Sequence, residues 1–413
     1  MPRDRYSAAM RVLMMVPDCQ MIDRRVLQQG RTLVEAGYEV VLLAGFECAK
    51  AEEYDWHGVR VVRCQFDWDD TRLRAIRAKL PDNDRLKGLV NKLWMKVIVR
   101  GLSIKPYDTF VLAQGRRSRA DVVHVHDLPL LKHGVILSRE WGVPLVFDAH
   151  EIYYEQECLP PRGQRRLRRE ERRGVPRTAL FSTVNEAIAL HYEKLYGRKP
   201  MVLLNCADRP AAGFDAQSRE LLRKKAGLAS DARVILYQGW ISAERNLTTL
   251  VRAAEFLPAG SYLVMIGYGA HEADLRAILE GKAWADKVRF LGRVEPEDIL
   301  PLTAGADVGV IPYLPIDLNH ELCSPNKFFE YVQSGVPVVA HDLVFFRGMK
   351  EKYGVVEVGD LSNPAGMAQA INSLAADSGT LKSMRGACAR AAEELNWEVE
   401  GKKLLAAYRN LSV

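Results

Sequence analysis

The sequence has few of the features that mark secreted, membrane-spanning or zinc-stabilised proteins. No apolar run approaches the ~18 residues that cross a bilayer, and the start, MPRDRYSAAM, lacks the apolar core of a signal peptide. The 7 cysteines among 413 residues are scattered and form no Cys-x-x-Cys pair, so we predict neither a disulfide framework nor a zinc site. We expect a cytoplasmic protein, either free or at the inner face of the membrane.

Glycine-rich and acidic ligand motifs are also scarce. VPDCQM follows the first predicted strand where a dehydrogenase would carry G-x-G-x-x-G, and GYGAHE has only two of those glycines. The acidic stretch DWDD (67–70) could hold Mg²⁺ or Mn²⁺ beside a diphosphate, but so short a match is common by chance. We predict that no metal and no cofactor is bound.

Apolar strands alternate with longer amphipathic segments along the whole chain, which is typical of parallel sheets with crossover helices. Most of the strands are continuous apolar runs, as strands buried on both faces require. The first set of predicted strands covers residues 11–17, 38–46, 59–66, 120–127, 143–151, 179–185 and 201–206. The second set covers 233–239, 261–269, 287–294, 307–313, 336–342 and 355–359.

The break between the two sets, NCADRPAAGFDAQ, has the small, polar and proline residues of a linker. We therefore predict an α/β protein with two Rossmann-like domains, 1–207 and 208–395, and a closing helix over 396–413 that packs back toward the first domain. Open α/β sheets bind ligands at the carboxyl ends of their strands. We expect the two sets of strand ends to face each other across a cleft.

The segment SPNKFFEYVQSGVPVVA (324–340) predicts a short helix followed by a buried strand. Ser324 suits the N-cap and Pro325 the first helical position, and Gly335 ends the helix. A helix N-terminus attracts phosphate, Lys327 would add a full charge, and Glu330 could accept hydrogen bonds from vicinal hydroxyls. The alternative is a solvent-exposed Lys–Glu pair worth only ~0.2 to 0.5 kcal/mol.

The net charge of +6 comes from the first half of the chain, where residues 1–200 hold 35 Lys and Arg against 26 Asp and Glu. The basic residues alternate with apolar ones at helical spacing, as in residues 84–104 and 162–177. Such segments either lie on anionic lipid or form solvated helix faces. Nucleic acid is not expected as a partner, because no aromatic stacking platform accompanies the charge.

Five segments, in order and in register, resemble the family 4 retaining glycosyltransferases of the GT-B fold. The resemblance covers nearly the whole chain and lies in MRVLMMVPDCQMIDRRVLQQGRTLVEAGYEVVLLA, in ADVVHVHDLPLL with VFDAHEIYYE, and in LYQGWISAERNLTTLVRAAEFL, MIGYGAHEADL and NKFFEYVQSGVPVVA. It implies a hexosyltransferase that uses a nucleotide diphosphate sugar, UDP- or GDP-linked, and a glycan or lipid-linked acceptor. It also implies the retaining reaction and a role in surface polysaccharide or glycoconjugate synthesis.

The same resemblance implies a donor site in the second domain. Glu330 matches the ribose-binding second glutamate of the family's E-x(7)-E motif, while Leu322 stands in the first position and Glu321 is off by one. Trp240 follows Gly239 and Asn246 occupies the lysine place of the usual phosphate clamp, so we assign the diphosphate to Arg245 and Lys327. The implied donor-binding residues are Gly239, Arg245, Val294, Ser324, Asn326, Lys327 and Glu330.

In the first domain His126 matches the family's active-site histidine, and with Glu330 it is our candidate catalytic residue. In retaining members the leaving phosphate takes the acceptor's proton, so His126 would orient the donor; the alternative is a structural histidine. We expect His124 to be structural and Asp127 to orient His126 or to cap the next helix. The acceptor-binding candidates are Asp23, Arg24, Arg25, His150 and Glu151, with a helix cap as the alternative for Asp23.

Two alternatives to a glycosyltransferase stay open at this point. A nucleotide-sugar epimerase of related architecture would convert the donor without any acceptor. A non-catalytic binding subunit would fit the missing first glutamate and the altered clamp.

Overall fold

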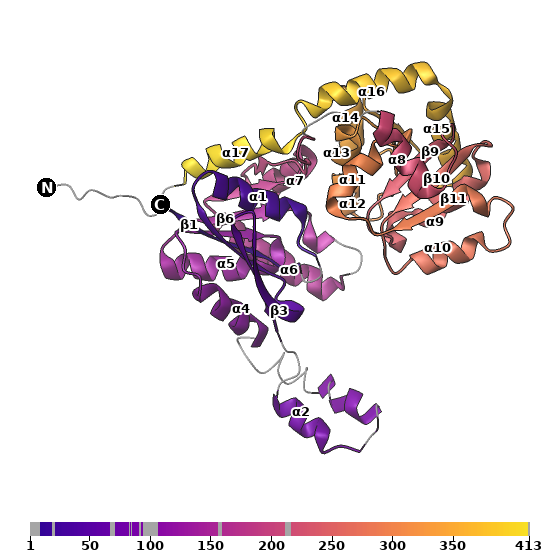
Figure 1. Cartoon of the computed structure of the whole chain (residues 1–413). Coiled ribbons are helices and arrows are strands. Elements are labelled where there is room, and N and C mark those ends of the chain that lie inside the picture. The colour runs from indigo at the N-terminus through magenta and orange to yellow at the C-terminus, as the bar shows by residue number, and fades with distance from the viewer. Residues whose placement is uncertain are drawn as a thin grey trace. The chain divides into compact units, whose positions relative to one another are not determined.

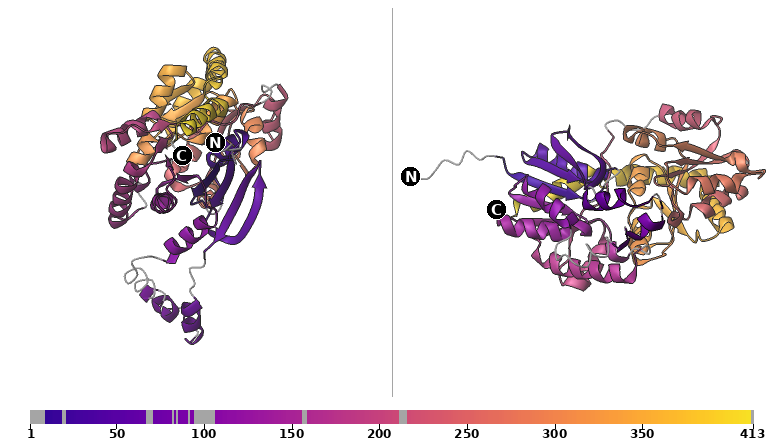
Figure 2. Two further views of the ribbon diagram at one scale, coloured as in Figure 1. Left: turned by 90° about the vertical axis from the view of Figure 1, so that its left-hand side faces the viewer. Right: turned by 90° about the horizontal axis from the view of Figure 1, so that it is seen from below.

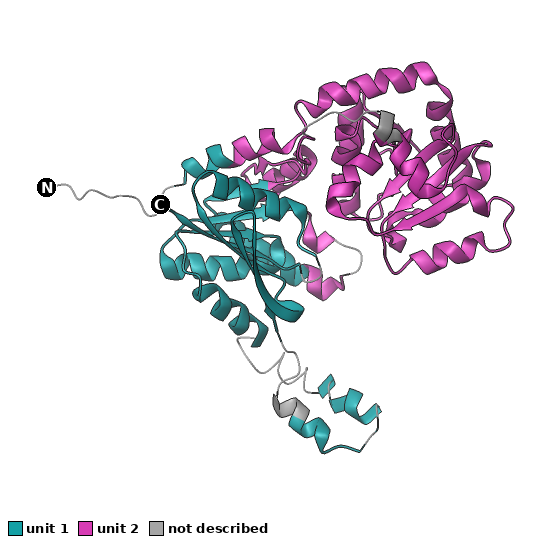
Figure 3. Cartoon of the chain, viewed as in Figure 1, with its two compact units in different colours: residues 1–150, 165–182, 405–413 teal, residues 151–164, 183–404 magenta. Residues whose placement is uncertain are grey.

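A computed structural model describes residues 9–18, 21–66, 71–81, 83, 85–90, 92–93, 106–155, 159–210 and 216–411. The acidic stretch 67–70 and most of the basic segment 84–104 lie outside these residues. The chain forms two compact units, which comprise residues 1–150, 165–182 and 405–413 and residues 151–164 and 183–404 (Figure 3). The two units divide the chain differently from the predicted domains, because residues 151–164 and 183–207 group with the second unit. The domain boundary at residue 207 stays a prediction.

The first sheet has eight strands in the order β3-β4-β2-β1-β5-β6-β7-β8. The ladder from β4 to β6 is parallel, and β3 pairs antiparallel with β4. Helices cover both faces of this sheet (Figures 1 and 2). The strands are β1 (Arg11–Val16), β2 (Glu39–Ala44), β3 (Glu47–Trp56), β4 (Val59–Gln65), β5 (Val122–His126), β6 (Leu145–Ala149), β7 (Leu180–Thr183) and β8 (Met201–Val202).

All seven strands predicted in the first half are present, but the prediction missed β3. Its sequence, ECAKAEEYDW, has no apolar run, and most of its residues are exposed. An edge strand exposed on both faces carries neither the alternating nor the continuous apolar signal. The helices of this half are α1 (Arg24–Glu35), α2 (Thr71–Ala78), α4 (Pro106–Arg116), α5 (Leu128–Trp141), α6 (Pro161–Gly174) and α7 (Glu186–Tyr196).

The second sheet is all parallel, with six strands in the order β11-β10-β9-β12-β13-β14. All six were predicted. The strands are β9 (Arg233–Gln238), β10 (Ser261–Ile266), β11 (Val288–Gly292), β12 (Val308–Ile311), β13 (Val338–His341) and β14 (Val356–Gly359). The helices are α8 (Ala216–Ala226), α9 (Leu247–Ala253), α10 (Glu272–Leu279), α11 (Pro296–Thr303), α12 (Leu318–Leu322), α13 (Asn326–Gln333), α14 (Val344–Tyr353), α15 (Pro364–Ala376), α16 (Ser378–Ala392) and α17 (Trp397–Arg409).

The strand orders place the candidate residues at two switch points. In the first sheet β1 lies between β2 and β5, and in the second β9 lies between β10 and β12. The chain leaves such neighbouring strands in opposite directions, which opens a crevice at their carboxyl ends. His126 ends β5, and Gly239 directly follows β9.

An aromatic cluster fixes the orientation of α13. The rings of Phe328 and Phe329 pack against Phe345 and Phe346 of α14, with centroids 5.1 to 5.9 Å apart, and none of the four is more than 5% exposed. Side chains three and four apart share a helix face. The cluster therefore turns the face that carries Lys327 and Glu330 toward the sheet and its switch point.

The last helix, α17, contributes a polar contact to the first unit. The hydroxyl group of Tyr408 lies 2.7 Å from Nδ1 of His124, and both side chains are buried. The ring of Tyr408 also packs edge-on against Tyr38. No helix in the described part of the chain is both long enough and apolar enough to cross a bilayer.

Helix α5 packs so closely on the first sheet that only glycine fits at residue 134. A Cβ atom there would lie 2.4 Å from Cγ2 of Val125 and 2.9 Å from Cδ1 of Leu145. We predict that Gly134→Ala lowers the free energy of unfolding by about 1 to 3 kcal/mol through overpacking. Gly348→Ala in α14, where the added methyl meets nothing within 4 Å, should raise it by about 0.5 to 1 kcal/mol. Calorimetric unfolding of both variants checks this, and equal shifts would contradict it.

Candidate functional site

Lys327 and Glu330 are not a solvent-exposed pair, so the alternative reading of these residues is wrong. Each residue is only 7% exposed. Oε2 of Glu330 accepts a hydrogen bond from Nε2 of Gln238 at 2.5 Å, and Oε1 of Gln238 accepts one from the hydroxyl group of Thr303 at 2.7 Å. The Gln238 amide therefore holds the Glu330 carboxylate in a fixed orientation at the end of β9.

The ammonium group of Lys327 is held by two tyrosines. It donates a hydrogen bond to the hydroxyl oxygen of Tyr313 at 2.7 Å and lies 4.1 Å from the ring centroid of Tyr237. The guanidinium of Arg245 lies 4.5 Å from the ring centroid of Tyr313. Burial lowers the pKa of Lys327, and the charge of Arg245 lowers it further. Within the described residues, no carboxylate lies within ion-pair distance of Lys327.

Gly239 is needed for this arrangement. Its φ is +119°, and a Cβ atom on it would lie 3.2 Å from Nζ of Lys327. The glycines of GYGAHE have a related role, because a Cβ on Gly267 would lie 1.9 Å from the carbonyl oxygen of Gly239. The loops after β9 and β10 thus pack backbone against backbone, beside the lysine.

The start of α13 differs from the prediction. The helix begins at Asn326, Pro325 occupies the N-cap position and no side chain caps the helix, so Ser324 is not the N-cap. The Ser324 hydroxyl group accepts a hydrogen bond from Asn185 at 3.1 Å and donates one to the carbonyl oxygen of Val184 at 3.4 Å. Because the Ser324 hydroxyl group binds Asn185 and Val184, it does not cap the helix. The first amide groups of α13 are thereby left without a side-chain cap.

The other implied donor-site residues are less closely grouped. Trp240, in the place of the family's clamp arginine, is 44% exposed, and its ring packs edge-on against Tyr268. The side-chain amide of Asn246 donates to the carbonyl oxygens of Pro312 and Leu361, both at 3.0 Å, and is therefore structural. Val294 lies after β11, partly buried against the core.

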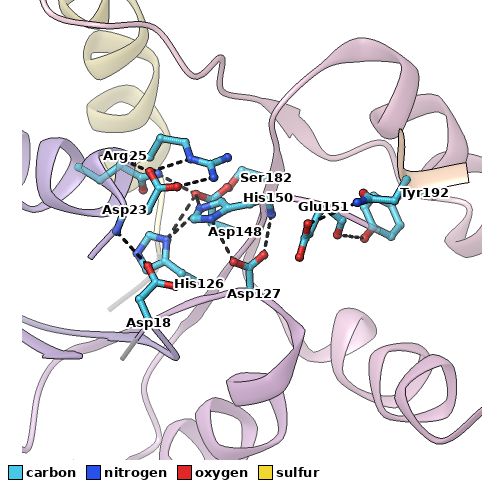
Figure 4. Close-up of polar contacts among 12 residues, drawn as sticks. Asp18, Asp23, Arg25, His126, Asp127, Asp148, His150, Glu151, Ser182 and Tyr192 are labelled. Atoms are coloured by element: carbon cyan, nitrogen blue, oxygen red, sulfur yellow. Dashed lines mark hydrogen bonds and ion pairs between the residues drawn. The ribbon is translucent and has the colours of Figure 1, made fainter. Parts of the chain in front are cut away.

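In the first unit the Asp148 carboxylate is the centre of a buried network (Figure 4). Ser182 donates to its Oδ1 at 2.7 Å, Gln29 donates to its Oδ2 at 2.7 Å, and Nε2 of His150 lies 3.0 Å from Oδ2. Nδ1 of His126 lies 3.5 Å from the same oxygen. Asp148 was not among the predicted site residues, although it lies near the carboxyl end of the predicted strand 143–151.

His150 is the charged histidine of this network. Its Nδ1 lies 3.1 Å from Oδ2 of Asp127, and its backbone amide donates to Oδ1 of Asp127 at 3.0 Å. Burial disfavours the imidazolium, but the carboxylates of Asp127 and Asp148 outweigh it and raise the pKa of His150 to about 10. Asp127 therefore binds His150 rather than orienting His126, and its side chain makes no cap hydrogen bond to α5. The predicted helix-cap role of the Asp127 side chain is therefore wrong, and no hydrogen bond joins Asp127 to His126 in the described structure.

His126, in contrast to His150, is neutral, because burial lowers its pKa. Nδ1 of His126 is engaged within the network, since it lies 3.5 Å from Oδ2 of Asp148 and 3.4 Å from Nε2 of His150. Nε2 of His126 is buried without a hydrogen-bond partner in the described structure. Such a nitrogen can form a hydrogen bond with a sugar hydroxyl group, which both donates and accepts.

The acceptor candidates separate into two groups. Asp23 caps α1 by accepting from the amide of Arg25 at 2.9 Å and also pairs with the Arg25 guanidinium, so the alternative reading as a helix cap is observed. Arg24 is half-buried beside them. Glu151 belongs to the second unit, where its Oε2 lies 3.4 Å from Nδ2 of Asn319.

One buried group has the composition of a metal site. His124, His126 and Asp148 each offer a ligand atom, and these atoms lie within 4.8 Å of one another. Both oxygens of Asp148 already accept hydrogen bonds from protein side chains, and Nδ1 of His124 contacts Tyr408. The hydrogen bonds account for the cluster as it stands.

We predict that Asp127→Asn lowers the pKa of His150 from about 10 toward its ordinary value. The raised pKa stabilises the fold below pH ~6.5, and this stabilisation is lost as the pH rises through the folded-state pKa. The variant should therefore lose its extra stability at lower pH than the unchanged protein. NMR titration of the histidine ring protons measures the pKa. Asp121→Asn is the control, because Oδ2 of Asp121 accepts a hydrogen bond from the backbone amide of Arg11, at the start of β1. An unchanged His150 titration in Asp127→Asn would contradict the assignment.

The chain matches two family models and several curated relatives. The model described as Glycosyl transferase 4-like domain matches residues 22–206, and the model described as Glycosyl transferases group 1 matches residues 232–377. A D-inositol 3-phosphate glycosyltransferase of Xylanimonas cellulosilytica is 26% identical over 322 residues, 72% of this chain and 74% of the relative. A 2-deoxystreptamine N-acetyl-D-glucosaminyltransferase of Streptomyces fradiae is 27% identical over 378 residues, 86% of this chain and 82% of the relative.

Solved structures share the fold. Anabaena HepE in complex with UDP and glucose has a TM-score of 0.72 and 16% identity, and the match covers 97% of this chain and 100% of HepE. The sucrose-phosphate synthase of Thermosynechococcus elongatus has a TM-score of 0.74 and 14% identity, with 97% and 98% covered. The two matched models, the relatives and this shared architecture confirm the predicted family and fold. The chain belongs to the family 4 glycosyltransferases, the group 1 glycosyl transferases of the GT-B fold.

Proposed function

We propose that the protein is a metal-independent retaining glycosyltransferase that moves a hexose from a UDP- or GDP-sugar to a hydroxyl group of a glycan or lipid-linked acceptor. The observation that carries this proposal is the buried ammonium group of Lys327, which has Arg245 beside it and no carboxylate partner among the described residues. A buried charge without a counterion is costly. A diphosphate would supply the missing negative charge.

The surrounding groups fit the rest of a nucleotide sugar. The uncapped amino end of α13 offers amide donors for phosphate oxygens. Glu330, held by Gln238, is placed to accept hydrogen bonds from ribose hydroxyl groups. Among the structures with the same fold, HepE binds UDP and UDP-glucose. These groups support a diphosphate leaving group whose developing charge is neutralised by cations and amides.

The proposed roles of the leaving phosphate and of His126 lead to a product that retains the anomeric configuration of the donor sugar. The described carboxylates near Lys327 and Arg245 are already bound, Glu330 to Gln238 and Glu244 to Ser242 and Arg245. In the proposed reaction the departing phosphate oxygen takes the acceptor's proton, the new bond forms on the face from which the diphosphate leaves, and His126 contributes its Nε2 to a sugar hydroxyl group. Catalysis then consists of orienting the substrates and stabilising the diphosphate.

We predict that Lys327→Met separates stability from function. Removing the buried ammonium group should raise the free energy of unfolding by about 1 to 3 kcal/mol, while the affinity for UDP and GDP falls about tenfold or more. Calorimetric unfolding and titration calorimetry measure the two effects. Lys350→Met removes an exposed lysine paired with Glu357 and should change neither.

The reaction itself is tested with candidate donors and acceptors in EDTA. The proposal requires nucleotide release that depends on an acceptor and continues without metal, with an anomeric configuration retained in the product. Strict metal dependence or inversion contradicts the mechanism. A donor converted without acceptor identifies an epimerase, and a donor that binds without any turnover identifies a binding subunit, which Leu322 in place of the family's first glutamate favours.

We further propose that the acceptor is reached at an anionic membrane surface through α6. Its arginines Arg165, Arg166, Arg168, Arg169, Arg172 and Arg173 are exposed, while Leu167 and Glu171 are buried. Each cation near such a surface contributes about 1 kcal/mol. We expect Arg165→Gln, Arg169→Gln and Arg172→Gln together to weaken binding to phosphatidylserine vesicles about tenfold or more at ~0.1 M salt. Lys224→Gln with Lys225→Gln on α8 is the control, and unaltered vesicle binding in the triple variant contradicts the proposal.

A further inference from the structure

Tyr313 contacts both cations of the second unit. It follows β12 and is 2% exposed. Its hydroxyl oxygen accepts the hydrogen bond from Lys327 at 2.7 Å, and its ring centroid lies 4.8 Å from the Lys327 nitrogen and 4.5 Å from the guanidinium carbon of Arg245. No resemblance pointed to this residue.

The physical need for such a residue follows from the charges. Lys327 and Arg245 repel each other. Glu330 attracts Lys327 without an ion-pair contact among the described residues, and Glu244 lies 4.0 Å from Arg245. The face of an aromatic ring carries partial negative charge and attracts cations, and a phenol oxygen is a hydrogen-bond acceptor. The ring and hydroxyl group of Tyr313 therefore hold two like charges close together in a way that an apolar side chain could not.

A backbone contact fixes the same residue relative to Arg245. The side-chain amide of Asn246 donates to the carbonyl oxygen of Pro312 at 3.0 Å. The residue after Arg245 is thereby tied to the residue before Tyr313. Lys327 also lies 4.1 Å from the ring centroid of Tyr237. Both cations therefore rest on rings of buried tyrosines, Lys327 on Tyr237 and Tyr313 and Arg245 on Tyr313.

We propose that Tyr313 is a positioning residue for donor binding, which presents the Lys327 ammonium group and the Arg245 guanidinium together to the diphosphate. This inference rests on the function proposed above. Tyr313 takes no part in bond making or breaking. Its effect is to fix the spacing and the protonation of the groups that meet the phosphate oxygens.

The test compares Tyr313→Phe with Tyr313→Leu. The phenylalanine keeps the ring and loses only the acceptor oxygen, so the KM for the donor should rise about tenfold with kcat nearly unchanged. Loss of the oxygen also lowers the pKa of Lys327 in the free enzyme, so the alkaline limb of the kcat/KM profile should move to lower pH. Leucine removes the ring as well and should weaken UDP and GDP binding further.

Tyr353→Phe is the matched control, since Lys352 lies 4.6 Å from its ring and its hydroxyl group donates to Glu394 at 3.0 Å, outside the site. It should leave the KM and the pH profile unchanged. If Tyr313→Phe keeps the original KM and alkaline limb, or lowers kcat and the melting temperature without the KM shift, the inference is overturned. Should Tyr313→Leu not fold, the isosteric Tyr313→Phe decides the question.

Different results would contradict the proposed function and the proposed role of Tyr313. If the unchanged, folded protein binds neither UDP nor GDP, the proposed function itself is wrong. If it binds them and Lys327→Met loses binding while both Tyr313 variants retain it, only the role of Tyr313 is wrong.

Discussion

Burial of the Lys327 ammonium group is the constraint on which the second unit's site depends. An ammonium group removed from water must find compensation. Here two tyrosines contact it directly, and the charge of Glu330 favours it without an ion-pair contact among the described residues. Other features of the site follow from that requirement. Gly239 leaves room for the lysine, and the phenylalanines behind α13 hold the helix so that the lysine cannot turn to solvent. The arrangement suits a ligand that brings its own negative charge.

The first unit solves the opposite problem. Its buried charges are compensated within the protein, because His150 lies between the carboxylates of Asp127 and Asp148. A satisfied network of this kind is rigid. It leaves His126 neutral beside it, with one ring nitrogen engaged and the other buried without a hydrogen-bond partner in the described structure. The second unit thus offers two neighbouring cations, with Glu244 4.0 Å from Arg245, and the first offers a neutral histidine held by a charged network.

Both sites use the same property of parallel sheets. Strands that reverse the order of connection leave an opening at their carboxyl ends, and the loops there can carry polar groups without disturbing the core. Asp23 after β1 and His126 at the end of β5 occupy this position in the first sheet. Gly239 after β9 and Tyr313 after β12 occupy it in the second. This correspondence agrees with the glycosyltransferase family to which the chain belongs.

The sequence by itself determined the strands whose burial on both faces makes them apolar, the parallel architecture and the family, and it selected His126, Lys327 and Glu330 as candidates whose roles stay predictions. It could not indicate β3, whose residues are polar because an edge strand is exposed. Nor could it separate the roles of Ser324 and Asp127, since each side chain is taken by a partner distant in sequence, Asn185 and His150. In the sequence, nothing distinguishes Tyr313 from other residues at the ends of predicted strands. Only the tertiary structure decided that it contacts two cations, because hydrogen bonds and ring contacts between distant segments depend on three-dimensional position and leave no periodic pattern.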